Sequence, residues 1–193
     1  SDLIQSQTRE LRQEISITGT LQPRNWTTVK AKVAGELSLL LVREGESVRQ
    51  GQVLARLDPL DAQARLDEKI ADLEAGRAQL VLAEKNRTNQ QALLKQNFIS
   101  QNAYDSALSS SQVSEAKLKA LQAQVAVTKK ALADTVVRAP QSGIVSQRHA
   151  QPGEKLPVDG RILTLVDLAE MEVEAALPAS DIPNLRLGQN VSF

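Results

Sequence analysis

The sequence predicts an α+β protein in which a long helical hairpin interrupts a small, split β-domain. Three observations support this fold. A glycine-containing motif occurs twice, around Gly35 and around Gly143. The segment between the copies carries leucines at a spacing of seven residues, which is typical of paired helices. Aromatic residues make up only 2% of the chain, which favours an elongated, multi-domain body of helix pairs and thin β-layers over a compact core.

The repeated motif predicts one β-domain made of two halves. Its glycines recur in the same order: Gly35, Gly45 and Gly51 in the first copy, and Gly143, Gly153 and Gly160 in the second. The first two pairs are 108 residues apart and the third pair is 109 apart, which predicts one extra residue in the last loop of the second copy. Each copy alone is too short to bury a core, so we expect the halves to close on each other. The last two glycines of each copy are expected in turns with positive φ.

Strands are predicted where apolar residues alternate between turn signals. Besides the second copy of the motif, the expected strands are residues 9–20, 28–33, 37–42, 53–57, 171–177 and 187–193. Residues 178–184 are expected to form a loop or one helical turn. Asp58 is placed to cap the first helix, and Pro59 has the fixed φ that a first helical turn tolerates.

Two long helices are predicted between the copies of the motif. Residues 60–134 contain one glycine and no proline. The inward-facing residues are expected to be Leu66, Leu73, Leu80 and Leu94 on the first helix, with Arg87 interrupting the series, and Leu118, Leu121, Val125, Thr128 and Leu132 on the second. Alanines are expected to line the same seam: Ala62, Ala83, Ala107, Ala116, Ala123 and Ala131. A break at residues 98–100 predicts an antiparallel coiled coil with arms roughly 50–55 Å long.

Composition disfavours several classes of function. Positive and negative charges balance at 23 each, so the basic surface typical of a nucleic-acid binder is not expected. The chain has no cysteine, one histidine (His149) and one methionine (Met171), so we expect no metal site, no cofactor and no hydrolytic centre. No apolar run approaches the length that spans a bilayer. The chain opens without Met and stops within an expected strand, so we expect it to be a fragment of a longer protein.

Several stretches together resemble the membrane fusion proteins, or periplasmic adaptor proteins, of bacterial efflux pumps. VREGESV at residues 42–48 and GQVLARLD at residues 51–58 look like the first half of the family's lipoyl-like domain. RAPQSGIV at residues 138–145 looks like the start of the second half. FISQNAYDSA at residues 98–107 resembles the hairpin tip of the branch that works with resistance-nodulation-division (RND) transporters.

This resemblance implies a domain order. The expected parts are residues 1–28 from a β-barrel, 29–58 from the first half of the lipoyl-like domain, 59–134 from the hairpin, 135–167 from the second half, and 168–193 again from the barrel. The barrel would therefore be incomplete in this chain. Hinges are expected at Asp58–Pro59, at residues 135–140 and near Asp167.

The resemblance also implies partners. Family members link an inner-membrane transporter to a TolC-type outer-membrane channel, typically as hexamers in the periplasm, attached to the inner membrane in the full-length protein. We therefore expect a non-enzymatic adaptor for export of drugs or other small molecules, with an RND transporter favoured. The alternatives are an adaptor of an ABC exporter or type I secretion system (haemolysin D-like), and a structural coiled-coil spacer.

The expected channel-binding residues lie at the hairpin tip: Asn89, Leu93, Phe98 and Ser100. In the RND branch the tip pattern is Arg, Leu four residues later, and Ser seven residues further on. Leu93 and Ser100 match it, whereas Asn89 occupies the Arg position, and Arg87 lies about 200° away around the helix. A simpler interpretation is that Leu93 closes the coiled coil and Ser100 caps the second helix.

An enzyme carrier domain is a further alternative, because lipoyl and biotinyl domains share the β-repeat. Such a domain displays an acylated lysine at a tight turn between its halves. Here the halves are joined through helices, after Pro59 and before Thr135, so that lysine has no counterpart. Lys155 is expected to be a surface charge.

Overall fold

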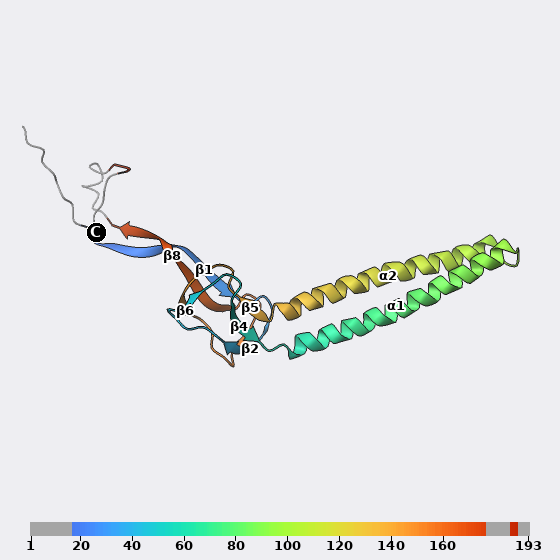
Figure 1. Cartoon of the computed structure of the whole chain (residues 1–193), viewed down its shortest axis with the longest axis horizontal. Coiled ribbons are helices and arrows are strands. Elements are labelled where there is room, and N and C mark those ends of the chain that lie inside the picture. The colour runs from blue at the N-terminus through green and yellow to red at the C-terminus, as the bar shows by residue number, and fades with distance from the viewer. Residues whose placement is uncertain (1–16, 177–185, 189–193) are drawn as a thin grey trace, which may run out of the picture. The chain divides into compact units, whose positions relative to one another are not determined.

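The computed structural model describes residues 17–176 and 186–188. These residues form two long helices, α1 (Leu60–Lys95) and α2 (Gln101–Ala133). The strands are β1 (Gly19–Lys30), β2 (Gly35–Leu40), β3 (Ser47–Val48), β4 (Val53–Leu57), β5 (Val136–Arg138), β6 (Gly143–Arg148), β7 (Lys155–Leu156) and β8 (Arg161–Ala175). The predicted α+β class and the two interrupting helices are confirmed (Figure 1).

The chain divides into two compact units. The larger unit is residues 26–166 and holds the hairpin and the β-domain, whereas the smaller unit is formed by residues 1–25 and 167–193. Strands β1 and β8 each contribute residues to both units. The predicted strand at 9–20 lies mostly outside the described residues, as do the predicted loop at 178–184 and most of the strand at 187–193.

The β-domain interleaves its two halves. Its sheets have the strand orders β1-β8-β6-β3 and β5-β4-β2-β7. Short strand β3 of the first half pairs with β6 of the second, and β7 of the second half pairs with β2 of the first. Each half thus completes the sheet of the other, as expected if neither copy of the motif can bury a core alone. The buried core is shared in the same way, with Leu54 and Leu57 from the first half packed with Ile162 and Leu165 from the second.

The two halves are related by a constant offset of 108 residues. The amide of Gly51 donates to the carbonyl of Ala139 over 2.8 Å, and the amide of Asp159 donates to Ala31 over the same distance. The turns at the two positions are closed by equivalent bonds, from Gln52 to Arg49 and from Gly160 to Pro157, each 3.0 Å long. The structure therefore equates Gly51 with Asp159, and the predicted extra residue in the second copy was wrong.

The same equivalence corrects one glycine prediction. Gly45, Gly51 and Gly153 have positive φ as predicted, but Gly160 does not. Asp159 takes the left-handed conformation instead, with φ of 64°. Aspartate tolerates this region better than most residues because its short polar side chain can bond locally. Gly160 is needed for space, since a Cβ there would lie 2.9 Å from the carbonyl oxygen of Pro157.

The hairpin packs along a heptad seam, as predicted. Leu66 and Leu73 are buried on α1, and the later members of that grid are half-buried, Arg87 included. On α2 the most buried residues are small: Ala107, Ser111 and Ser114. The predicted seam alanines at positions 116 and 123 are exposed instead, because the inward positions between them are taken by Leu118 and Leu121.

Within the smaller unit, the ends of β1 and β8 carry complementary side chains. Arg24 contacts Glu170 and Glu172 at 3.4 and 3.2 Å, and Gln22 donates to Glu174 at 3.1 Å. These groups are exposed, so each pair contributes little to stability. The other face exposes Leu21, Met171 and Val173. The assignment of this unit to an incomplete β-barrel stays a prediction.

Candidate functional site

The hairpin tip is a tight turn closed by backbone hydrogen bonds. The amide of Phe98 donates to the carbonyl of Leu93 over 3.0 Å, and the amide of Asn97 donates to Leu94 over 2.9 Å. Asn97 has φ of 58°. This pair of bonds, with a left-handed residue just past the helix, is a Schellman motif. Asparagine is the usual substitute for glycine at this position, and the sequence analysis missed that signal at Asn97.

Ser100 begins α2 as its N-cap. Its backbone is extended, and its hydroxyl oxygen accepts a hydrogen bond from the amide of Ala103 at 3.3 Å. This satisfies one of the amides that the first helical turn leaves without a partner. The interpretation of Ser100 as a helix cap is therefore confirmed. Its side chain remains exposed, so the hydroxyl can also be reached from outside.

The tip presents apolar side chains to solvent. Phe98 is 72% exposed and Leu93 is 37% exposed. The two residues are joined through the backbone bond that closes the turn, so they lie together at the end of the hairpin. The chain has only two phenylalanines, and one of them is exposed at the far end of the hairpin, which makes Phe98 a candidate contact residue.

Asn89 and Leu93 lie one helical turn apart on α1, and both are exposed. Arg87 is half-buried and occupies an inward position of the seam. The structure thus places Asn89 on the tip surface with Leu93 and excludes Arg87 from that face. Leu94 and Tyr104, which the sequence analysis did not single out for the tip, are half-buried where the two helices meet behind the turn.

The outer faces of the helices also carry exposed apolar residues. Val81 and Leu82 on α1 are about two-thirds exposed, as are Val113 and Val127 on α2. Gly76 fixes the relative height of the helices, because Leu121 fills the space of its missing side chain: a Cβ there would lie 2.5 Å from Leu121 Cδ1. Counting outward from this pair places Leu82 and Val113 at similar heights on the hairpin.

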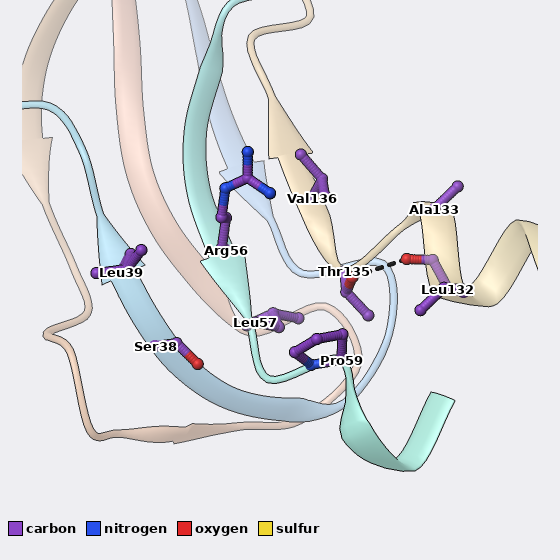
Figure 2. Close-up of a pocket in the computed structure, with 9 residues that line it drawn as sticks. All are labelled: Ser38, Leu39, Arg56, Leu57, Pro59, Leu132, Ala133, Thr135 and Val136. Atoms are coloured by element: carbon purple, nitrogen blue, oxygen red, sulfur yellow. Dashed lines mark hydrogen bonds between the residues drawn. The ribbon is translucent and has the colours of Figure 1, made fainter. Parts of the chain in front are cut away.

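The root of the hairpin contains an open, mainly apolar cavity of about 470 Å³ (Figure 2). Leu57 and Pro59 form one wall, and the end of α2, with Leu132 and Ala133, forms another. The hydroxyl of Thr135 donates to the carbonyl of Leu132 over 2.7 Å. Backbone bonds from Leu57 to Thr135 and from Asp58 to Glu36, each 2.8 Å, tie the root to the β-domain. The hinges expected at these junctions stay predictions.

The charges of the larger unit are mostly solvated. The pKa of Lys69 is raised by its hydrogen bonds to Asp72, foremost, and to Glu68, both at 3.1 Å. His149 is half-buried and bonds through Nε2 to the Thr164 hydroxyl at 2.8 Å. No group of three potential metal ligands occurs among the residues that the structure describes. Neither α1 nor α2 has an apolar stretch long enough to cross a bilayer.

The structure defines a class of protein: a split β-domain of two interleaved repeats with a helical hairpin inserted between them. The family profile of the CzcB-like, barrel-sandwich hybrid domain matches residues 25–167. The chain therefore belongs to the membrane fusion (adaptor) protein family of bacterial efflux systems, as the sequence motifs predicted.

Curated relatives agree with this assignment. The chain is 33% identical to the macrolide export protein MacA of Yersinia pestis, over 96% of this chain and 54% of the relative. It is also 33% identical to the multidrug resistance protein MdtA of Xenorhabdus bovienii, over 85% and 40%. The chain thus spans about half the length of the curated relatives that it matches.

A solved structure supports the fold. The membrane fusion protein Spr0693 of Streptococcus pneumoniae superposes with a TM-score of 0.70, at 20% identity, over 90% of this chain and 75% of that one. At this identity the likeness concerns the fold alone.

Proposed function

We propose that this chain is the hairpin-bearing part of a non-enzymatic periplasmic adaptor, which connects an inner-membrane transporter to a TolC-type outer-membrane channel. The observation that carries the proposal is the hairpin tip. A helix pair inserted between the halves of a β-domain holds Leu93 and Phe98 in solvent at its far end. The turn is fixed by the Schellman bonds and by the Ser100 cap, so this apolar end is preorganised for docking.

The contact would use each tip residue differently. Phe98 and Leu93 would be buried against the ends of the channel's helices, because they are apolar and face outward. Asn89 and the hydroxyl of Ser100 would supply hydrogen bonds at the rim. Asn89 carries no charge, so the contact at this position would depend less on salt than one made by arginine.

Self-association is part of the proposal. Leu82 on α1 and Val113 on α2 face outward at similar heights, so a second copy placed alongside brings one against the other. Such a contact joins different surfaces of the two copies and closes into a ring when the rotation permits. We expect a hexamer, as in the family that the sequence resembles.

Export of small molecules fits the relatives, which include a macrolide export protein and a multidrug resistance protein. We favour an RND transporter as the inner-membrane partner because the FISQNAYDSA stretch at residues 98–107 resembles that branch. An adaptor of an ABC exporter or type I secretion system is the second candidate. The length of the hairpin favours the first candidate over a haemolysin D-like adaptor, since such adaptors usually have longer arms than the 36 and 33 residues of α1 and α2.

Drug susceptibility tests the proposal. In cells lacking the native gene, the full-length protein should restore resistance, and the variant Leu93→Asp with Ser100→Arg should not. The control for the apolar-to-acidic change is Val127→Asp, on an exposed residue far from the tip. Normal resistance in the tip variant, at normal expression, would refute docking through the tip and favour a structural spacer.

A further inference from the structure

The seam between α1 and α2 changes in character along the hairpin. The Gly76–Leu121 contact, together with the bond from Lys117 to Gln79 at 3.1 Å, fixes which residues face each other. Because both helices repeat every seven residues, the facing pairs can be followed in both directions. Towards the base the seam contains Leu80 with Leu118, Leu73 with Val125, and Leu66 with Leu132, all buried or half-buried.

Towards the tip the same counting gives three successive pairs in which neither residue is a large apolar one. They are Ala83 with Ser114, Arg87 with Ser111, and Gln90 with Ala107. The α2 members are buried, with Ser111 only 4% exposed, and the α1 members are half-buried. We call residues 83–90 and 107–114 the polar zone. Beyond it, Leu94 and Tyr104 restore an apolar pair directly behind the turn.

The polar zone contributes little to holding the helices together. Burying a small side chain such as alanine or serine removes far less apolar surface from water than burying a leucine. Arg87 brings a charge to the seam, and no ion pair of Arg87 occurs among the described residues. Ser114 satisfies its own hydroxyl by donating to the carbonyl of Ser110 at 3.0 Å, so it makes no bond across the seam.

The tip beyond the zone has its own closure. The Schellman bonds and the Ser100 cap join the two helix ends, and Leu94 and Tyr104 pack behind them. The zone buries little apolar surface although its small side chains are covered, and it lies between two stretches with larger apolar side chains. It is therefore expected to open first, since short helices without a packing partner are marginal in water.

We infer that the polar zone is a built-in joint, at which the helices separate locally so that the closed tip moves relative to the base of the hairpin. The use of this movement rests on the proposed function: it lets Phe98 and Leu93 adjust to the helix ends of the channel. The joint itself follows from the seam and does not depend on the identity of any partner.

Hydrogen exchange of this chain tests the joint. Amides in residues 83–90 and 107–114 should exchange at least about tenfold faster than those in 66–80 and 118–132. The variant Arg87→Leu should slow exchange in the zone, because it extends the leucine series. The control Asn86→Leu, on an exposed neighbouring position, should leave it unchanged. Exchange as slow in the zone as at the base would overturn the inference.

A disulfide staple tests how the joint is used. Residues 1–193 contain no cysteine, so Ala83→Cys with Ser114→Cys can close the zone without a competing thiol from this part of the protein. A photoreactive residue at position 98 of the full-length protein reports contact with the channel in cells. The oxidised staple should lower the yield of the channel adduct, and reduction should restore it. The control staple, Lys69→Cys with Thr128→Cys, lies two heptads nearer the base and should have no effect.

The outcomes separate the existence of the joint from its use in docking. An equal adduct yield with the zone stapled would overturn the use of the joint in docking. A missing adduct in the unstapled protein would contradict the proposed function, and the hydrogen-exchange result would still decide whether the joint exists.

Discussion

Truncating one seam leucine should destabilise the hairpin, whereas the same truncation on the outer face should not. Leu73 is 8% exposed and faces α2, whereas Leu82, nine residues further along the same helix, is 68% exposed. Leu73→Ala removes nearly all of a buried side chain and leaves a space that a two-helix seam can partly close. We therefore expect a loss near the lower end of the usual range, about 2–3 kcal/mol.

Leu82→Ala is the matched control. It is the same leucine-to-alanine change in the same helix. Leucine and alanine have similar helix propensities, so the effect of propensity on stability is small and equal in the two variants. We expect the free energy of unfolding to change by less than about 0.5 kcal/mol. The assay is urea unfolding followed by far-ultraviolet circular dichroism, which reports mainly on α1 and α2. Equal losses for the two variants would refute the assigned seam, as would a larger loss for Leu82→Ala.

Three further predictions concern the tip and one charged residue. Asn97→Gly should leave the thermal midpoint unchanged or raise it, whereas Asn97→Val should cost about 1–2 kcal/mol, because φ of 58° is unfavourable for a β-branched residue; a harmless valine would contradict the turn. Ser100→Ala should cost about 1 kcal/mol and Ser100→Asp should keep the cap, so a loss of docking in Ser100→Asp, at unchanged stability, would assign the hydroxyl a role in contact. The pKa of Lys69 is raised above 10.5 by Asp72 and Glu68, so the contribution of Lys69 to stability is complete below pH 10.5 and is lost as the pH rises through the folded-state pKa. The thermal midpoint of Lys69→Met should therefore fall less than that of the unmodified protein in this alkaline range. An identical fall in the two proteins would contradict the assignment.

The repeat and the heptads could be predicted from the sequence because each is periodic, and the period follows from turn conformation in the repeat and from burial of one helix face in the heptads. Glycines at Gly45 and Gly153 mark turns that need positive φ, and leucines such as Leu66 and Leu73 mark the only face that a helix pair can bury. The tip turn was placed correctly for the same reason, since Ser100 is a strong helix-start signal and is observed as the cap.

The register of the second repeat was not readable in the same way. Matching Gly51 to Gly160 assumes that the left-handed position keeps its glycine, but Asp159 occupies it and Gly160 serves a steric need one residue later. The exposed alanines at positions 116 and 123 show a related limit, because alanine suits either face of a helix and does not reveal which one is buried.

The docking role of the tip residues depends on a partner that lies outside this chain. Sequence and fold place Asn89, Leu93, Phe98 and Ser100 on one exposed end, but an exposed position alone does not name what covers it. The family assignment and the apolar character of Phe98 support the proposal.

The most direct test is photocrosslinking in cells from two positions of the full-length protein, 98 at the tip and 82 on the outer face of α1. The account predicts an adduct with a TolC-type channel from position 98 and an adduct with a second copy of the adaptor from position 82. A channel adduct from position 82 but not from position 98 would contradict docking through the tip, as would the lack of a channel adduct from both positions in a correctly folded protein.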